Sequence, residues 1–218
     1  MKNIKVNFMD IFFSVIMPVT LEMYEGAANN RVEKFRRAVK SLLTNLFPDA
    51  HRELIIVSDG CELSEAIFKD EFSMYKNLRF YKIPKQPLFS GNVRQFGLNK
   101  SRGEYILYLD SDDVIGEWHL TNIQRGLKAN SFPDWAYYDD YIVRGIRDIA
   151  LKKVYIQHGS IGTSSICHKR LPEFTWEGCD GYGHDWTFIQ KLMKHNNKPP
   201  KLAKAQYFIH HIPNLVDF

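Results

Sequence analysis

The stretch Gly103-Glu104-Tyr105-Ile106-Leu107-Tyr108-Leu109-Asp110-Ser111-Asp112-Asp113 decides how the rest of this 218-residue chain is interpreted. Residues 105–109 are all apolar or aromatic and follow a glycine-containing turn, which is typical of a short strand buried on both faces. Three carboxylates fall within the next four positions. Because ligands of open α/β sheets bind at the carboxyl ends of strands, this stretch predicts a site at the end of a central strand.

The three carboxylates have two interpretations. Carboxylates this close repel one another unless a cation lies among them, and hard divalent cations prefer oxygen ligands. The alternative is an Asp-rich turn that caps the next helix, because Asp favours turns and N-caps. Three acidic residues directly after a buried strand favour the cation site.

Apolar patterning before this stretch predicts an alternating chain of strands and helices. Strands are predicted at residues 12–17, 53–60, 78–83 and 105–109, and helices at 32–46, 64–74, 91–101 and around 120–127. Pro18 is expected to end the first strand, because proline cannot donate to a central ladder. The alternation predicts an α/β fold with a mainly parallel sheet and helices on both faces.

The pattern becomes less regular after residue 130. Strands are predicted at 135–143, 153–157 and 204–211, and a helix at 185–195. The small, polar segment 159–167 is suitable for a loop that lines a site. We therefore expect a smaller, mixed region to follow the regular first half.

Composition sets broad limits on function. The 29 basic and 25 acidic residues give a net charge of +4 and a pI of about 8.8, which permits an anionic partner without requiring one. The three cysteines, Cys61, Cys167 and Cys179, are too scattered for a disulfide framework and indicate a reducing, cytoplasmic location. The apolar stretch 8–17 is interrupted by Asp10 and is too short for a membrane span, so no transmembrane segment is expected.

Five segments then stand in a recognisable order. They are an apolar strand ending in proline (14–18), a strand ending in Asp-Gly (54–60), a glycine-to-arginine segment (91–95), Gly-Glu-Tyr-Ile (103–106) and Asp-x-Asp-Asp (110–113). Together they resemble the family 2 glycosyltransferases of the GT-A fold. The resemblance implies one Rossmann-like domain over residues 1–218, with a nucleotide-sugar-binding half (1–116) and an acceptor-side half (117–218).

The resemblance also implies an activity. It is the metal-dependent, inverting transfer of a sugar from a nucleoside diphosphate sugar, UDP-sugar favoured, to an acceptor hydroxyl, with Mn²⁺ or Mg²⁺ as the cofactor. By the same resemblance, Asp59 accepts a hydrogen bond from the base, Arg94 lies near the diphosphate, and Pro18 and Thr20 touch the nucleotide. The alternatives are a turn residue for Asp59 and a solvated helix residue for Arg94. The residues Val19-Thr20-Leu21, and Gln95 in place of asparagine, depart from the family pattern at this end.

The metal and the base follow from the same resemblance. Asp112 is implied to ligate the metal, Asp110 to hold the ribose or help position the cation, and Asp113 to reach a sugar hydroxyl. A histidine near the chain end, His210 or His211, is implied as a further ligand, although only one of two adjacent strand residues can face the site.

The carboxylate that opens the late helix is Asp185, in Gly183-His184-Asp185-Trp186, and it is implied to be the catalytic base. Asp180 competes for this role, and simple helix capping is the alternative for Asp185.

Two rival functions remain. Asp110-Ser111-Asp112-Asp113-Val114 also fits the Asp-x-Asp-x-Val signature of haloacid-dehalogenase-like phosphatases, with Asp110 as nucleophile and Asp112 as acid/base. That motif normally ends the first strand of its core, whereas three strands are predicted to precede it here. The other rival is a catalytically inactive protein that binds a nucleotide or a glycan.

The acceptor has two candidates, a glycan or lipid-linked saccharide and a modified base of phage DNA. Six cations would contact DNA phosphates in the second case, unless they form a solvated surface: Lys85, Arg94, Lys100, Arg102, Lys152 and Lys153. The oligomeric state is not predicted.

Overall fold

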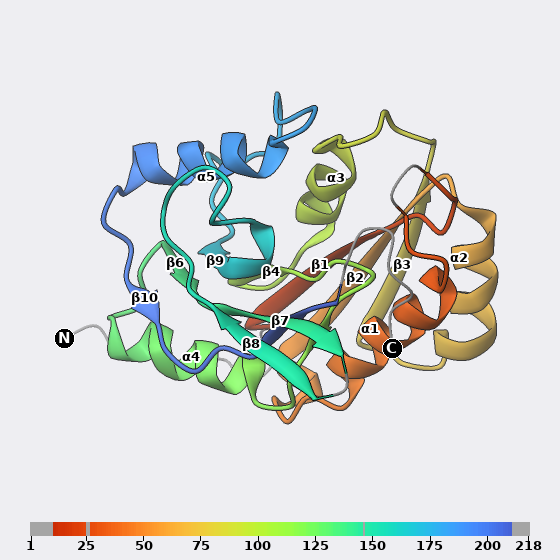
Figure 1. Cartoon of the computed structure of the whole chain (residues 1–218), viewed down its shortest axis with the longest axis horizontal. Helices are drawn as coiled ribbons and strands as arrows, with labels where there is room; N and C mark the ends of the chain where they lie inside the picture. The colour runs from red at the N-terminus through yellow and green to blue at the C-terminus, as the bar shows by residue number, and fades with distance from the viewer. Residues whose placement is uncertain (1–10, 25–26, 146, 211–218) are drawn as a thin grey trace.

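The computed structural model describes residues 11–24, 27–145 and 147–210 (Figure 1). Its strands are β1 (Phe13–Val19), β2 (Arg52–Asp59), β3 (Leu78–Ile83), β4 (Tyr105–Tyr108), β5 (Val114–Ile115), β6 (Trp135–Tyr138), β7 (Asp140–Gly145), β8 (Asp148–Lys152), β9 (Ile166–Lys169), β10 (Lys201–Leu202) and β11 (Tyr207–Ile209). Its helices are α1 (Arg31–Leu43), α2 (Glu62–Ile67), α3 (Asn92–Lys100), α4 (His119–Ala129) and α5 (His184–His195), with short helical turns at Asp49–His51, Phe68–Phe72 and Thr163–Ser165.

Within these residues the larger sheet has seven strands in the order β10-β6-β9-β4-β1-β2-β3. Strand β1 lies between β4 and β2 and is parallel to both, with Val15 opposite Leu54 of β2 and Leu107 of β4. β3 is parallel to β2, and β10 is parallel to β6, whereas β9 is antiparallel to β4 and β6. The predicted α/β fold with a mainly parallel sheet is confirmed, and β3 has the predicted bounds.

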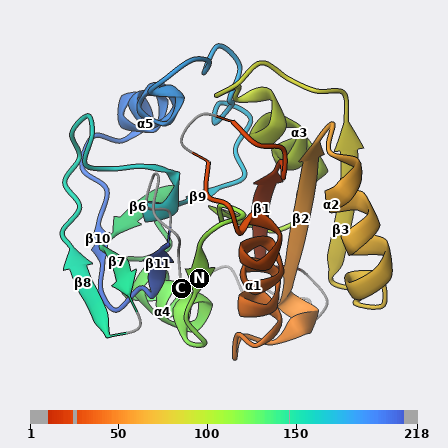
Figure 2. The ribbon, with the colours of Figure 1, turned by 45° about the vertical axis from the view of Figure 1, so that its right-hand side comes forward.

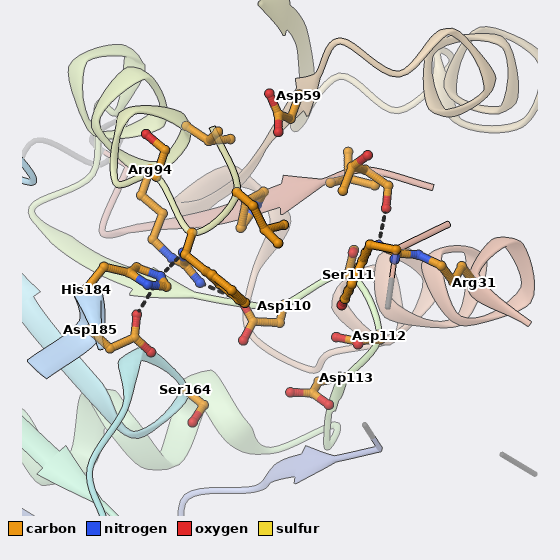
Figure 3. A pocket seen from close by; sticks show the side chains of 18 of the residues that line it. Arg31, Asp59, Arg94, Asp110, Ser111, Asp112, Asp113, Ser164, His184 and Asp185 are labelled. Atoms are coloured by element: carbon orange, nitrogen blue, oxygen red, sulfur yellow. Dashed lines mark hydrogen bonds and ion pairs between the residues drawn. The ribbon is translucent and has the colours of Figure 1, made fainter. Parts of the chain in front are cut away.

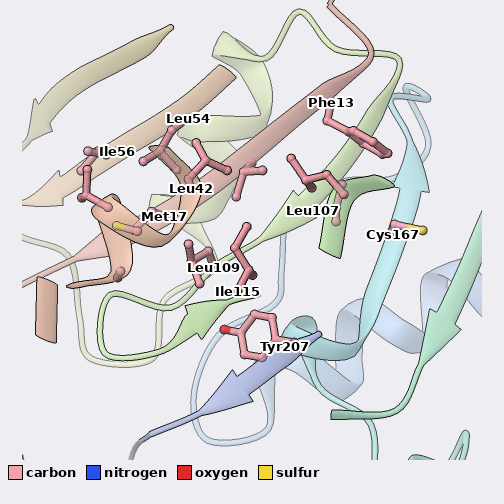
Figure 4. Packing of buried hydrophobic residues seen from close by; sticks show 14 of the residues in the cluster. Phe13, Met17, Leu42, Leu54, Ile56, Leu107, Leu109, Ile115, Cys167 and Tyr207 are labelled. Atoms are coloured by element: carbon pink, nitrogen blue, oxygen red, sulfur yellow. The ribbon is translucent and has the colours of Figure 1, made fainter. Parts of the chain in front are cut away.

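Helices cover both faces of this sheet, as predicted (Figure 2). Successive strand residues face opposite sides. On one side Met17, Leu54 and Leu107 share a buried cluster with Leu42 of α1 and Ile123 of α4, and Figure 4 shows this packing around β1, β2 and β4.

On the other side Ile16 and Ile106 pack with Leu98 of α3 and Phe188 of α5. Gly97 lets α3 approach β1 closely, because a Cβ there would lie 2.5 Å from Ile16 Cγ2.

The predicted end of the first strand is wrong. β1 continues through Pro18 to Val19, and Pro18 lies opposite Val57 of β2. The register with β4 already ends at the pair Ile16 and Tyr108. Neighbouring residues of a strand point their amides to alternate sides, so the nitrogen of Pro18 faces β4, as the amide of Ile16 does. Since the pairing with β4 has ended before Pro18, the missing amide removes no hydrogen bond between strands.

The smaller sheet has the order β5-β11-β7-β8 in the described part of the chain. β11 is antiparallel to β5 and parallel to β7, which forms an antiparallel pair with β8. The mixed character of the second half is therefore confirmed, and β11 brings the end of the described chain to the strand that follows the acidic stretch.

Several strand predictions in this half are wrong in detail. The strand predicted at 135–143 is two strands in different sheets, β6 and β7, separated at Asp139. The carboxylate of Asp139 accepts a hydrogen bond from the amide of Val154 and forms an ion pair with Lys201. No strand forms at 153–157. The amide of Val154 donates to the Asp139 carboxylate and the amide of Tyr155 donates to Ser160 Oγ, so neither is available to pair with a neighbouring strand.

Two further expectations concern the chain as a whole. All three cysteines are free and buried, as expected without a disulfide framework. No helix in the described residues combines the length and the apolar character that crossing a membrane requires.

Candidate active site

A pocket of about 450 Å³ opens at the carboxyl ends of β1, β2 and β4 (Figure 3). We call it the main pocket. It brings together eight residues singled out in the sequence: Pro18, Thr20, Asp59, Arg94, Asp110, Asp112, Asp113 and Asp185. Ser164, from the segment 159–167 expected to line a site, also borders it. Its lining further includes residues that the sequence did not indicate, among them Tyr24, Arg31, Phe89, His184 and Ile209.

The acidic stretch is held by β11. The amide of Asp110 donates to the hydroxyl of Tyr207 (3.0 Å), and that hydroxyl donates to Asp113 Oδ2 (3.0 Å). The amide of His210 donates to Asp113 Oδ1 (2.7 Å). Asp113 is only 4% exposed, and both of its oxygens accept hydrogen bonds from the protein. This carboxylate therefore ties β11 to the turn after β4.

The electrostatics of this turn reflect crowding of like charges. The pKa of Asp110 is raised to about 6, chiefly by burial and further by the neighbouring carboxylates Asp112 and Asp185, against the opposing effect of Arg94. Burial, followed by Asp112 and Asp110, also raises the pKa of Asp113. The turn thus carries more negative charge than Arg94 offsets, which favours a cation or a proton in the pocket.

Arg94 links the acidic turn to the late helix. Its Nη2 donates to Asp110 Oδ1 (2.9 Å), its Nη1 lies 3.0 Å from His184 Nε2, and its guanidinium lies 5.3 Å from the ring centroid of Trp176. Burial lowers the pKa of Arg94, but Asp110 and Asp185 outweigh it, so the net shift is upward. The alternative of a solvated helix residue is wrong, because Arg94 is buried.

The contacts of His184 define its tautomer. Arginine only donates hydrogen bonds, so His184 Nε2 must accept from Arg94. The proton is then on Nδ1, which lies 3.2 Å from the carbonyl of Gly181. Burial lowers the pKa of His184, which keeps this ring neutral at pH 7. Nε2 therefore has no proton to donate to Asp185 Oδ1, although the two atoms are 3.1 Å apart.

Asp185 consequently keeps hydrogen-bonding capacity. Its Oδ2 receives long hydrogen bonds from the amide and the hydroxyl of Thr163 (3.4 and 3.3 Å), and its buried Oδ1 has none. The competitor Asp180 instead accepts from Ser90 Oγ (3.1 Å) and the amide of Gly91 (3.3 Å). Of these two carboxylates, only Asp185 lines the main pocket.

The opposite end of the main pocket lies at the end of β2. Asp59 Oδ1 accepts from the amide of Gln86 (2.6 Å), and Lys85 Nζ lies 3.5 Å from Asp59 Oδ2. The same ammonium donates to Thr20 Oγ1 (3.3 Å) and forms an ion pair with Glu22 (3.1 Å). These contacts hold Asp59 and Thr20 in place along one wall.

Of the two histidines near the chain end, only His210 lies within the described residues. The carbonyl of His210 accepts from Nζ of the buried Lys34 (3.0 Å), so its backbone is fixed on both sides of the residue. His211 lies outside the described residues. No group of three His, Cys, Asp or Glu side chains is arranged as a metal-binding set within residues 11–24, 27–145 and 147–210.

Arg31 is the most informative residue that the sequence reasoning missed. It begins α1, donates to the carbonyl of Thr20, and lies 4.6 Å from the ring centroid of Tyr24. A cation is unfavourable at a helix N-terminus, where the helix dipole is positive. An arginine at the first helical position, where a cation is disfavoured, was thus the signal in the sequence that set Arg31 apart.

Known proteins resemble this chain in sequence. The family model for glycosyl transferase family 2 matches residues 14–148. The poly(ribitol-phosphate) β-N-acetylglucosaminyltransferase TarP of Staphylococcus aureus (strain N315) is 33% identical over 122 residues, which are 54% of this chain and 33% of TarP. The minor teichoic acid biosynthesis protein GgaB of Bacillus subtilis (strain 168) is 31% identical over 113 residues, which are 51% of this chain and 11% of GgaB.

Solved structures share the fold. Residues 1–349 of TarS from S. aureus align with a TM-score of 0.72 at 19% identity, covering 91% of this chain and 60% of that one. The complex of the same fragment with UDP-GlcNAc aligns with a TM-score of 0.71 at 20% identity, covering 91% and 58%.

The fold is that of the GT-A glycosyltransferases. The chain belongs to glycosyl transferase family 2, because the family model matches more than half of its residues. It spans a third or less of the length of the two curated relatives.

Proposed function

We propose that this chain transfers a sugar from a UDP-sugar to an acceptor hydroxyl with inversion at the anomeric carbon. The observation that carries the proposal is a single pocket that joins three carboxylates after β4 to Asp185 at the start of α5. The acceptor oxygen bonds to the anomeric carbon as the bond from that carbon to the diphosphate oxygen breaks. The hydroxyl proton passes to Asp185, and UDP leaves.

The wall that contains Asp59 is the proposed site of the nucleotide. A carboxylate at the end of β2 suits a base edge that presents an N–H donor, and Pro18 and Thr20 line the same pocket. The TarS fragment has been solved with UDP-GlcNAc and with UDP, which supports uridine here. Arg94, and Arg31 on α1, supply fixed positive charge for a diphosphate.

The acidic turn fits a divalent cation shared with the donor. Mg²⁺ is usually held by one or two carboxylates together with substrate phosphates rather than by a complete protein cage. Asp110 and Asp112 would hold Mn²⁺ or Mg²⁺ in this way. Burial raises the pKa of Asp110 and the charges of Asp112 and Asp185 add to the rise, so a cation at this turn would favour the ionised carboxylate. When bound, the metal would offset charge on the departing diphosphate. His210 or His211 remains a proposed further ligand.

Asp185 is the proposed base. The tautomer of His184 leaves Asp185 Oδ1 without a hydrogen bond, so the carboxylate keeps capacity to accept a proton. Thr163 holds Oδ2 and orients the group. We assign Asp113 a positioning role, since Tyr207 and His210 occupy both of its oxygens.

A saccharide or polyol acceptor is favoured over DNA. The relatives TarP and GgaB are named for poly(ribitol-phosphate) and teichoic acid. Four of the six cations suggested for DNA form ion pairs with carboxylates: Arg94 with Asp110, Arg102 with Glu53 (2.8 Å), Lys152 with Asp140, and Lys85 with Glu22 and Asp59. They do not form an uncommitted phosphate-binding stripe.

The two rival functions fit less well. Three parallel strands, β1 to β3, precede β4, and Asp110 is bonded to Arg94 rather than free to attack phosphorus. Membership of family 2 rules out the phosphatase. An inactive binding protein would not need the three carboxylates after β4 together with a candidate base, Asp185, in one pocket.

The test is donor hydrolysis followed by ¹H NMR, with UDP-GlcNAc and UDP-glucose and water as the acceptor. Wild-type protein with Mg²⁺ is expected to release UDP, and the first sugar to appear is the β anomer, because the donor linkage is α. Asp185→Asn should slow release at least about a hundredfold, within the range for loss of a general base. The α anomer appearing first, or undiminished release by Asp185→Asn, would overturn the proposal.

A further inference from the structure

A smaller pocket of about 280 Å³ adjoins the main pocket and shares Phe89, His184 and Asp185 with it. We call it the side pocket. Its other lining residues are His158, Gly159, Ile161, Tyr182, Gly183 and Trp186. The carboxylate of Asp185 therefore borders both pockets. A group bound in the side pocket reaches the same carboxylate as a donor bound in the main pocket.

Exposed aromatic rings surround the side pocket. Tyr182 is 92% exposed and Phe89 is 42% exposed. Their ring centroids are 5.8 Å apart at an interplanar angle of 86°, and those of His158 and Trp186 are 6.0 Å apart at 77°. Trp186 is half-buried against the core, whereas Tyr182 and Phe89 are exposed. Large exposed aromatic side chains gathered on a concave surface mark a binding surface.

The backbone around these rings is in an unusual conformation. Phe89 has a φ of +58°, and Tyr182 lies between Gly181 (φ +77°) and Gly183 (φ +91°). A non-glycine residue in the left-handed region is uncommon, and such residues gather at binding sites where the surrounding structure holds them. Two loops that are distant in sequence thus hold their aromatic rings at one pocket.

The charge of the side pocket limits what it binds. Among the described residues its lining includes neither lysine nor arginine, and Asp185 is its carboxylate. A phosphate or carboxylate on the ligand would need a cationic partner and would be repelled by Asp185. Aromatic walls with a few polar groups suit a ligand that has an apolar face and uncharged polar edges.

A sugar ring has this character, because its C–H bonds form a flat apolar face and its hydroxyls point outward. We propose that the side pocket binds an uncharged sugar ring of the acceptor, with the ring against Tyr182 and Trp186 and a hydroxyl directed at Asp185. This inference rests on the proposed function. Any phosphate of the acceptor lies outside the side pocket.

Saturation-transfer NMR tests this proposal without a known acceptor. The probes are the methyl glycosides of glucose, galactose and N-acetylglucosamine, with ribitol and glycerol 3-phosphate as an acyclic and a charged comparison. Spectra are recorded with and without UDP and Mg²⁺. We expect transfer to the C–H protons of at least one glycoside and none to glycerol 3-phosphate.

Variants locate the binding. Tyr182→Ala and Trp186→Ala should each weaken glycoside binding about three- to tenfold, as for loss of one aromatic contact. Tyr182→Phe should retain binding, because it keeps the ring. Tyr75→Ala is the matched control, since Tyr75 is also exposed and lines neither pocket. UDP affinity should be unchanged in the side-pocket variants, since neither residue lines the main pocket.

The outcomes separate the two levels of the proposal. Transfer to ribitol or glycerol 3-phosphate alone, no transfer to any glycoside by a protein that binds UDP, or transfer unaffected by Tyr182→Ala and Trp186→Ala would each overturn the side-pocket proposal. A protein that binds no UDP would overturn the proposed function instead.

Discussion

Neutralising Asp110 should stabilise the metal-free protein at high pH. The pKa of this carboxyl is raised from its ordinary value of 3.8 to about 6, chiefly by burial, so ionisation is less favourable in the folded state. Folding stability from this group is then fully present below pH 3.8 and is lost as the pH rises through about 6. Asp110→Asn fixes the group in a neutral form and removes this loss.

The magnitude follows from the shift and the exposure. A rise from 3.8 to about 6 corresponds to roughly 3 kcal/mol as an upper limit, at about 1.36 kcal/mol per unit of pKa. The Asp110 side chain is 36% exposed, so solvent screening reduces the expected gain to about 1 kcal/mol. We therefore expect Asp110→Asn to raise the free energy of unfolding by about 1 kcal/mol at pH 8 and by nothing measurable at pH 3.5.

Guanidinium chloride unfolding at the two pH values, with chelator present, measures this difference. Asp70→Asn is the matched control, because it makes the same change at an exposed position away from the main pocket. The control should stay within about 0.5 kcal/mol of wild type at both pH values. A destabilised Asp110→Asn at pH 8, or an equal gain at both pH values, would refute the reasoning.

Three further substitutions test the contacts that build the site. Arg94→Lys keeps the charge but loses the two-pronged guanidinium that contacts both Asp110 and His184. The rate of donor hydrolysis, followed by NMR, should fall at least about tenfold while the circular dichroism spectrum stays unchanged. Full activity would show that the guanidinium is dispensable. Tyr207→Phe removes the hydroxyl that holds Asp113 and should lower the unfolding free energy by about 1–3 kcal/mol in chemical denaturation, a neutral result arguing against that anchor. Gly97→Ala should destabilise by about 1–3 kcal/mol in the same assay, because its Cβ would overlap a β1 side chain, and wild-type stability would contradict the close approach.

Local patterns predicted the regular half of the fold well. The buried stretch 105–109 contains β4 and the apolar run 54–57 lies within β2, because continuous apolar runs have few alternatives to a central parallel strand. Residues at the ends of those strands then had to meet at one edge of the sheet. Asp59 and Asp110 line one pocket for this reason.

The rest depended on contacts between residues distant in sequence. β6 and β7 are separated at Asp139, whose carboxylate accepts a hydrogen bond from the amide of Val154 and forms an ion pair with Lys201. A local hydrophobic pattern contains no information about such distant partners. Leu46, the last residue of the apolar pattern that predicted a helix at 32–46, is 52% exposed because α1 ends at Leu43. The hold of Tyr207 on the acidic turn, nearly a hundred residues away, was equally invisible to local patterns.

The most direct test of the central claim is calorimetric titration of UDP, with GDP and CDP as controls, into wild type and Asp112→Asn with and without Mn²⁺. We expect UDP to bind in preference to the other nucleotides and more tightly with Mn²⁺, and Asp112→Asn to abolish the effect of the metal. Failure of the folded wild-type protein to bind UDP, or Mn²⁺-enhanced binding that survives Asp112→Asn, would contradict it.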